Sequence, residues 1–320
     1  TSVTIPEGVT SIGSSAFSGC SGLTSVTIPS SVTSIEERAF SHCFDLTSVH
    51  ISDIVAWCRI SFSYAIANPF YYAKNLYLNG ELVSNLVIPE GVTSIRDYAF
   101  YGCSDLTSVT IPSSVTSIGS YAFSGCKGLT SITIPSSVIS IGGSAFSGCT
   151  GLPSTFTIPE GVTTLGDGII DGCTNIKRLV LPSTLTSWGD YESEGIFYSA
   201  FAHSSIEEVI LSEGLISIGR GAFAYCPNLT SVMIPNSVTS IERGAFFDCT
   251  ALTSVTIPTN VTSIGEVAFS NCSNLTSVTI PEGLTSIASS AFNYVAPETL
   301  TAARFPNGIG MSEKNLKTLI

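Results

Sequence analysis

The feature that most constrains this chain is an internal repeat of 23 residues. An Ile-Pro dipeptide, or a variant with Leu or Ser in one position, occurs twelve times between Ile5 and Ile280, and eight of the eleven spacings are 23 residues. The other spacings are 37 residues after Ile51, 24 residues after Ile134 and 30 residues after Leu181. A fixed period of this length predicts a solenoid, in which each repeat is one coil and stacked coils build a continuous core.

Each repeat carries two short apolar stretches and a turn. In residues 23–43, Val26 and Ile28 alternate with Ser and Thr, which is the period of a strand with one buried face, and Pro29 ends that strand. A second apolar pair follows, and then Ala-Phe-x-x-Cys, which we expect to form one helical or 3₁₀ turn. One unit cannot bury its own apolar face, so we expect parallel pairing between the strands of neighbouring coils.

The repeated phrases LTSVTIPSSVTSIGSYAFSGC and SAFSGC resemble the BspA-like leucine-rich repeats, and the likeness extends over about 295 of the 320 residues. The resemblance implies an α/β fold class. It implies a right-handed, curved solenoid of about 13 coils, with a parallel sheet on the concave side and short helical or 3₁₀ turns on the other side. It also implies secretion or display on a cell surface, with adhesion or host-matrix binding in some members.

The spacings predict one solenoid domain over residues 1–305, with a degenerate thirteenth coil at Phe305-Pro306. Insertions interrupt the domain at about 53–85 and 188–200, and residues 306–320 are expected to form a cap or tail. The sequence starts inside a strand, without a polar cap or a leader. We therefore expect the native protein to continue upstream, with its targeting signal outside this sequence.

Composition excludes several classes of protein. The mean hydropathy is +0.41, but no stretch approaches the roughly 18 apolar residues of a spanning helix, so we do not expect an integral membrane domain. The net charge is −12 and no basic run is present, which argues against nucleic acid as a partner. Only 11% of the residues are charged, which argues against disorder.

Nothing in the sequence predicts catalysis. The chain has no Cys-x-x-Cys pair, His-Glu-x-x-His motif, phosphate-binding loop or Gly-x-Ser-x-Gly motif, and its three histidines match no metal or triad pattern. We therefore predict no enzyme activity, no cofactor and no metal site. Nine of the ten cysteines share one repeat position, where stacked coils favour a ladder of free, buried thiols over disulfides.

The first insertion is rich in aromatic residues. Asp53 is placed to cap a short helix over 54–60, and Asn79-Gly80 predicts a tight hairpin turn. The aromatic residues, among them Trp57, Tyr71 and Tyr72, have two interpretations: they form a protrusion that contacts a partner, or they pack against the coils.

The second insertion places Trp188 and Tyr191 beside the carboxylates of Asp190, Glu192 and Glu194. This group is able to hold a cation or a sugar, but it lacks the ligand spacing of a calcium loop. The other interpretation is a solvated loop.

The strand residue just before Ile-Pro points away from the core and is usually Thr. Three successive coils carry Val180, Ile210 and Met233 there instead, and Arg178 and Glu208 stand two residues earlier in the first two. We expect Arg178 to pair with Glu208, and Lys177 with Glu207, across the strands. An apolar patch with a charged rim predicts a partner site, while neutral drift among good strand formers is the alternative.

The leading hypothesis is a non-catalytic, secreted or cell-surface module that binds proteins of a host matrix, a host cell or a neighbouring cell through its concave face. The alternative is a carbohydrate-binding surface protein. Its rings would be Trp57, Tyr71, Tyr72, Trp188 and Tyr191. A third hypothesis, a Thr ladder that orders water as in ice-binding solenoids, is opposed by the broken Thr column.

Overall fold

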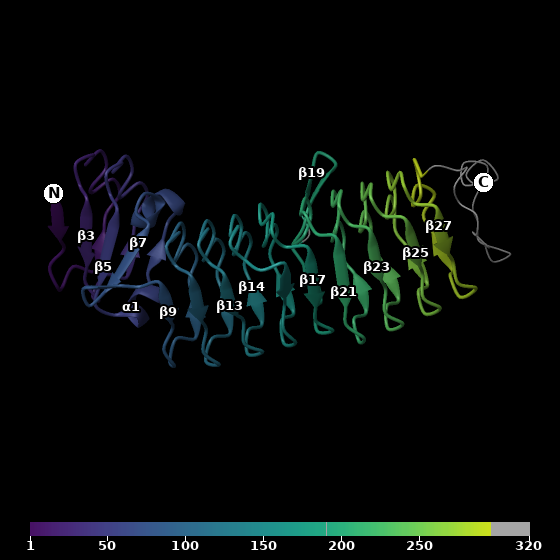
Figure 1. Ribbon diagram of the computed structural model, residues 1–320, viewed down its shortest axis with the longest axis horizontal. Helices are drawn as coiled ribbons and strands as arrows, with labels where there is room; N and C mark the ends of the chain where they lie inside the picture. Colours follow the sequence, from purple (N-terminus) through teal and green to yellow (C-terminus); the bar gives the residue numbers. More distant parts are fainter. Residues whose placement is uncertain (190, 296–320) are drawn as a thin grey trace. The chain divides into compact units, whose positions relative to one another are not determined.

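The computed structural model of this protein describes residues 1–189 and 191–295. The chain divides into two compact units, residues 1–153 and 154–320. In each unit the chain winds through successive coils whose strands pair in parallel (Figure 1), which confirms the predicted leucine-rich-repeat solenoid. The predicted thirteenth coil and the cap at 306–320 lie outside the described residues, and the single domain over 1–305 stays a prediction.

The first strand of each coil is the Ser-Val-Thr segment before Ile-Pro. It pairs in register with the same segment of the next coil, so that Val3 lies opposite Val26. In the first unit these strands are β1 (Ser2–Thr4), β3 (Ser25–Ile28), β5 (Ser48–Ile51), β9 (Asn85–Val87), β11 (Ser108–Thr110) and β13 (Ser131–Thr133). In the second unit they are β15 (Thr155–Thr157), β17 (Arg178–Leu181), β21 (Glu208–Leu211), β23 (Ser231–Met233), β25 (Ser254–Thr256) and β27 (Ser277–Thr279).

The Val-x-x-Ile segment forms a second, two-residue strand in each coil. In the first unit these are β2 (Ser11–Ile12), β4 (Ser34–Ile35), β6 (Ser61–Phe62), β10 (Ser94–Ile95), β12 (Ser117–Ile118) and β14 (Ser140–Ile141). In the second unit they are β16 (Thr164–Leu165), β18 (Ser187–Trp188), β22 (Ser217–Ile218), β24 (Ser240–Ile241), β26 (Ser263–Ile264) and β28 (Ser286–Ile287).

Each insertion interrupts the ladder of second strands. In the first unit one ladder ends at β6 and a separate ladder begins at β10. In the second unit β18 ends one ladder and β22 begins the next. The insertions therefore lie where the second strands of neighbouring coils no longer pair, although the Arg96 N–H still donates to the carbonyl oxygen of Cys58 across the first break at 3.3 Å.

The first insertion folds largely onto the coils of its own unit. Asp53 accepts hydrogen bonds from the backbone N–H groups of Val55 and Ala56 and so caps helix α1 (Ile54–Cys58), as predicted, although the helix ends two residues earlier than expected. Two 3₁₀ turns follow, η1 (Ala65–Ala67) and η2 (Pro69–Tyr71).

The predicted hairpin at Asn79-Gly80 is confirmed. It joins β7 (Asn75–Leu78) to β8 (Glu81–Leu82), and both turn residues have positive φ. Strand β7 also pairs in parallel with β5, so the insertion adds a strand to the first-strand sheet.

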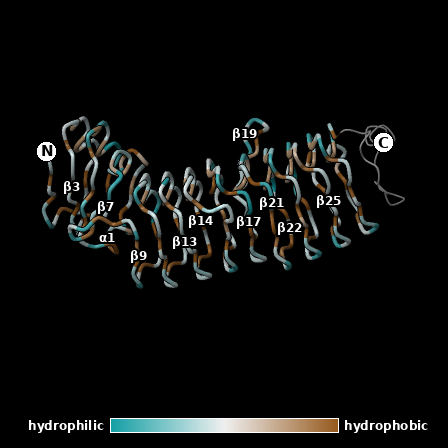
Figure 2. Tube along the Cα trace, viewed as in Figure 1, coloured by the Kyte–Doolittle hydropathy of each residue, from teal (hydrophilic) through white to brown (hydrophobic). Residues whose placement is uncertain are grey.

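The core of each unit consists of the same apolar positions repeated from coil to coil, as the recurring brown segments show (Figure 2). Phenylalanine rings of successive coils stack on each other; the ring centroids of Phe100 and Phe123 are 5.4 Å apart, and those of Phe246 and Phe269 are 5.2 Å apart. Burial of these rings and of the aliphatic side chains is the main favourable contribution to folding.

The Ala-Phe-x-x-Cys segments of the regular coils are turns, and the described helices all lie in the first insertion. Left-handed residues explain this difference. In one coil Tyr121, just before Ala122, has a φ of 57°, and Gly125, just before Cys126, has a φ of 76°. A right-handed helix cannot pass through a left-handed residue, so two such positions limit each segment to single turns.

Hydroxyl side chains connect neighbouring coils at the surface. Thr130 Oγ1 donates to the carbonyl oxygen of Thr107, 23 residues earlier, at 3.1 Å, and Ser137 Oγ donates to the carbonyl oxygen of Val115 at 2.8 Å. The same two bonds recur in other coils. Much of the Ser and Thr content is therefore structural, because it satisfies main-chain acceptors between coils.

Candidate binding surface of the second unit

The three apolar side chains predicted from the sequence lie next to each other on the outer face of the first-strand sheet in the second unit. Val180 in β17 lies directly opposite Ile210 in β21, and Ile210 lies opposite Met233 in β23. Val180 and Ile210 are half-buried, whereas Met233 is 81% exposed. We call these three residues the strand-face patch.

A charged rim borders the strand-face patch, as the sequence predicts. Arg178 lies opposite Glu208, with 3.3 Å between Nε and Oε2, and Lys177 Nζ lies 3.1 Å from Glu207 Oε1. All four side chains are about half exposed, so each pair contributes at most about 1 kcal/mol to stability. The rim is electrically balanced, and it orients a partner more than it attracts one.

A hollow of about 540 Å³ extends the strand-face patch toward the next coils. Its wall combines apolar and uncharged polar side chains with the charged side chains of Arg178 and Glu208. The lining residues include Arg178, Glu208, Ile210, Met233, Asn236, Ser254, Thr256 and Pro258. The hollow crosses a gap in the sheet, because β23 ends one four-stranded sheet and β25 begins another. The sheet edge therefore opens beside the most exposed apolar residue.

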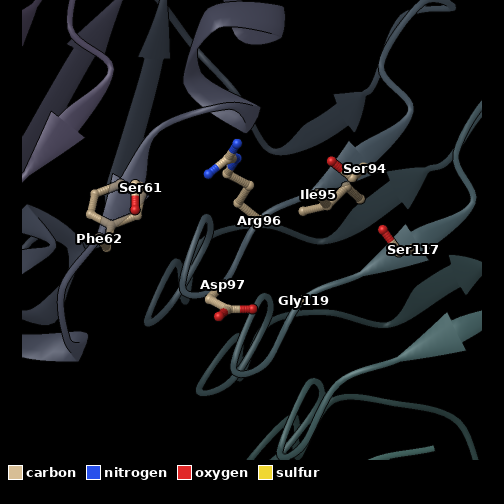
Figure 3. A pocket seen from close by; sticks show the side chains of 8 residues that line it. All are labelled: Ser61, Phe62, Ser94, Ile95, Arg96, Asp97, Ser117 and Gly119. Carbon is tan, nitrogen blue, oxygen red and sulfur yellow. The ribbon is translucent and has the colours of Figure 1, made fainter. Parts of the chain in front are cut away.

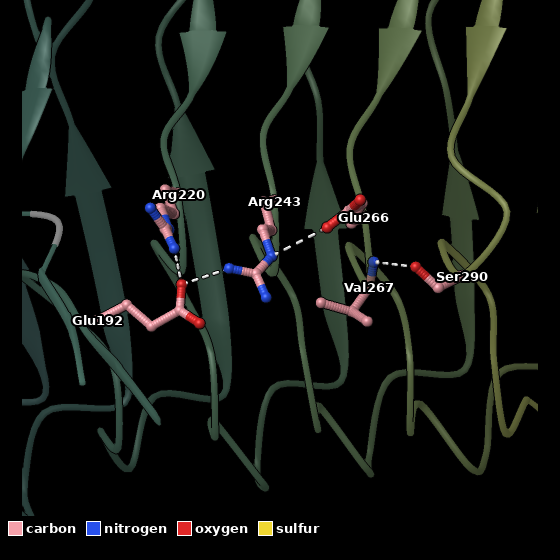
Figure 4. A network of polar contacts seen from close by, with 6 residues as sticks. All are labelled: Glu192, Arg220, Arg243, Glu266, Val267 and Ser290. Atoms are coloured by element: carbon pink, nitrogen blue, oxygen red, sulfur yellow. Dashed lines mark hydrogen bonds and ion pairs between the residues drawn. The ribbon is translucent and has the colours of Figure 1, made fainter. Parts of the chain in front are cut away.

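The second insertion forms an antiparallel hairpin of β19 (Tyr191–Ser193) and β20 (Ile196–Tyr198). Glu192 on this hairpin is 13% exposed and pairs with both Arg220 and Arg243, and Arg243 Nε also lies 3.3 Å from Glu266 Oε2 (Figure 4). The solvated-loop interpretation is wrong for Glu192. Asp190 lies outside the described residues.

Phe197 fixes the other side of this hairpin. Its buried ring packs against Ala202 and Ala224, with Phe247 alongside, and the guanidinium carbon of Arg243 lies 5.6 Å from the ring centroid. This contact combines apolar burial with cation–π attraction. The hairpin is thus held to the coils from both sides.

The five aromatic residues proposed for sugar stacking divide into two groups. Trp57 and Trp188 are 1% and 2% exposed, so they offer no open ring face, and this part of the prediction needs correction. Trp57 Nε1 donates to the carbonyl oxygen of Ala99 at 2.9 Å, and Trp188 occupies the core position that Ile fills in other coils. Tyr71 and Tyr191 are exposed and Tyr72 is half-buried.

The cysteines are all free in the structure, and nine of the ten are buried. Cys20 is exposed, contrary to the expectation for its column. Six buried thiols of the column donate to a carbonyl oxygen of the preceding coil, as Cys43 Sγ does to that of Phe17. Burial raises the thiol pKa of Cys103, Cys249 and Cys272, which makes them poor nucleophiles.

Comparison with known proteins agrees with this geometry. The model of the BspA type leucine rich repeat region matches in six copies, over residues 1–67, 72–192 and 194–314. The chain belongs to the BspA-type leucine-rich repeat family. None of the curated proteins matches it.

Bacterial proteins are among the solved structures that are similar to this BspA-type chain. A leucine-rich repeat protein from Bacteroides ovatus is 27% identical, with a TM-score of 0.63, over 92% of this chain and 76% of that one. One from Eubacterium ventriosum is 25% identical, with a TM-score of 0.51, over 98% and 86% of the two chains. A leucine rich cell surface protein from Faecalibacterium prausnitzii is 26% identical over 99% and 90%, with a TM-score of 0.46.

Sequence reasoning missed part of the surface of this BspA-type chain. The hollow also includes Asn236, Ser254 and Pro258, which differ little from the same positions in other coils. Only the Asn of Pro-Asn-Ser, where three other coils have Pro-Ser-Ser, gave a signal. The residues described by the structure contain no group of three metal-ligating side chains and no helix long and apolar enough to cross a membrane.

Proposed function

We propose that this chain is a non-catalytic binding module of a secreted or surface-displayed protein, and that it binds a protein partner through the strand-face patch. The observation that carries the proposal is the position of Met233. A large apolar side chain is 81% exposed at the edge of a hollow, although Thr256 stands at the same position in the next coil and Thr is the usual residue of this column.

The chemistry of the surface supports a protein as the partner. Exposed apolar residues with a polar rim are typical of protein contact sites. Methionine adapts its shape to a partner, and the paired charges of Arg178 and Glu208 offer both a donor and an acceptor. BspA-type membership supports display at a cell surface and a partner on a host matrix, a host cell or a neighbouring cell.

The proposal is tested by measuring adhesion of the purified chain to immobilised extracellular matrix and to intact epithelial cells. The double variant Ile210→Asp/Met233→Asp is expected to lose at least about tenfold in affinity, because it places charge where apolar contact is needed. The matched control is Thr110→Asp/Thr133→Asp, which alters the same column in the first unit.

Each outcome of this experiment counts. Loss of adhesion in the patch variant alone, with thermal unfolding unchanged, supports the proposal. Equal adhesion of the two double variants would overturn the assignment of the patch, and absence of adhesion by the wild-type chain to either surface would overturn the assignment of the partner.

A further inference from the structure

A second hollow lies in the first unit, where the first insertion interrupts the second-strand ladder between β6 and β10. It has a volume of about 280 Å³. Ser61 and Phe62 lie on one side of it, and Ser94, Arg96, Asp97 and Ser117 lie on the other (Figure 3). The regular coils keep these strands paired, so the hollow exists because of the insertion.

Arg96 and Asp97 bring opposite charges to this hollow, with their charged ends pointing away from each other (Figure 3). Asp97 Oδ1 accepts a hydrogen bond from the backbone N–H of Ser120 at 2.7 Å, which fixes the carboxylate. The guanidinium of Arg96 makes no ion pair with any residue that the structure describes, and both side chains are exposed. The hollow therefore offers free donors from Arg96 at one place and a free acceptor oxygen of Asp97 at another.

A row of tyrosine rings begins at Tyr98, directly after Asp97 in the chain and outside the residues that line the hollow. Tyr98 stacks on Tyr121, with centroids 5.2 Å apart and planes 6° apart. It also contacts Tyr101, which stacks on Tyr71 with planes 9° apart. We call Tyr71, Tyr98, Tyr101 and Tyr121 the tyrosine ladder.

The tyrosine ladder ends at Tyr121. The corresponding residue of the next coil is Ser144, so no further aromatic ring covers Tyr121, which is exposed. Burial raises the pKa of Tyr98, and the neighbouring Tyr121, Asp97 and Tyr101, with Tyr64, contribute to the shift.

We propose that this hollow and the tyrosine ladder form a binding site for a neutral polysaccharide. The C–H face of a pyranose ring is apolar and stacks on aromatic rings, as other apolar groups do. Hydroxyl groups on different sugar units of a polysaccharide accept hydrogen bonds from the Arg96 guanidinium and donate them to the Asp97 carboxylate. A simple anion or cation would meet one like charge among the two.

The site is separate from the strand-face patch. All its residues lie in the first unit, whereas the patch lies in the second. It also differs from the sugar site expected from the sequence, because it needs neither Trp57 nor Trp188 and includes Arg96, Asp97, Tyr98 and Tyr121. Failure of one proposal leaves the other standing.

Affinity electrophoresis of the purified chain tests the proposal. The gels contain soluble β-glucan, xylan, mannan, galactan or N-acetylglucosamine polymer, with polygalacturonate and heparin as acidic polymers. Wild-type protein is expected to be retarded by at least one neutral polymer. Tyr121→Ala, Arg96→Gln and Asp97→Asn are each expected to weaken the retardation constant at least tenfold.

Two controls separate binding from folding. Tyr294→Ala removes a more exposed ring in the second unit and is expected to bind as the wild type does. Ile210→Asp/Met233→Asp alters only the strand-face patch and is also expected to bind normally. Any variant with a lowered unfolding temperature is replaced by the milder Tyr121→Leu or Arg96→Lys.

Three results would overturn the proposal: no retardation of the wild type by any neutral polymer, retardation by acidic polymers alone, or equal retardation of the wild type and all three site variants. Retardation that is lost in the site variants and kept in both controls supports it.

Discussion

The thiol of Cys126 donates a hydrogen bond to the carbonyl oxygen of Phe100, 26 residues earlier in the chain, with 3.1 Å between sulfur and oxygen. Cys149 makes the same bond to Phe123, and Cys272 makes it to Phe246. The cysteine column is therefore part of the hydrogen bonding between coils. It fills a small buried site and satisfies a main-chain acceptor there.

Burial predicts the reactivity of these thiols. At pH 8 in native buffer, one thiol, that of Cys20, is expected to react rapidly with a disulfide reagent, because the other nine are buried and the thiolate is the reacting form. All ten are expected to react in denaturant. Cys20→Ser should remove the rapid phase; a rapid phase that persists in this variant would contradict the structure.

Burial also predicts a loss of stability at alkaline pH. Burial raises the pKa of Cys272 from its ordinary value of 9.0 to about 12, and that of Cys226 to about 11. Above pH 9 the unfolded chain loses these protons while the folded chain keeps them. The stabilisation is therefore complete below pH 9 and declines above it by about 1.4 kcal/mol per pH unit for each thiol, until the folded pKa is reached.

Urea unfolding between pH 7.5 and 10.5 measures this decline. Cys272→Ala is expected to be less stable than the wild type at pH 7.5 and to lose less stability as the pH rises. Parallel curves for the two proteins would contradict the assigned cause.

The hydroxyl bonds between coils predict the effect of a nearly isosteric substitution. Thr130→Val removes the hydrogen bond to the Thr107 carbonyl oxygen and is expected to lower the free energy of unfolding by about 0.5–1 kcal/mol. The matched control is Thr110→Val. Thr110 is the exposed strand residue just before Ile-Pro, and the same position one coil earlier is occupied by Val87. It is expected to leave stability unchanged or slightly raised; a larger loss in the control would refute this account.

Gly244 is predicted to be intolerant of any side chain. Its φ is 65°, and an added Cβ would lie 2.3 Å from Cζ of Phe197. Gly244→Ala is therefore expected to cost about 2–4 kcal/mol, from backbone strain and overpacking together. Gly195→Ala isolates the strain, since its φ is 82° and no atom lies within 4 Å of the added Cβ; it is expected to cost about 1 kcal/mol. Thermal melts of both variants provide the comparison.

The 23-residue period predicted the contacts between residues that occupy the same repeat position in neighbouring coils. Arg178 faces Glu208 because both occupy one repeat position in neighbouring coils, and register alone is enough to infer the contact. Trp188 follows Leu185 with the spacing of Val-x-x-Ile, so its burial was also readable from the sequence. Tyr98 and Tyr121 share a repeat position as well, and a comparison of that column would have found the tyrosine ladder.

The remaining contacts join positions that the repeat does not relate. Glu192 reaches Arg243, 51 residues away, from an insertion with no counterpart in other coils. The hollow beside Arg96 depends on how far the first insertion separates β6 from β10. Both depend on the three-dimensional path of an irregular segment, which a 23-residue pattern does not encode.

Thr130 bonds to Thr107 and Cys149 bonds to Phe123, and equivalent residues make the same bonds between other regular coils. A regular coil therefore makes the same kinds of contact with the coil before it and with the coil after it. Gene duplication or unequal recombination in steps of one coil therefore lengthens or shortens the protein without creating a mismatched interface. The two insertions do not copy in this way, since each needs its own partners. The number of regular coils is therefore free to change, whereas the surface beside each insertion is not duplicated with them.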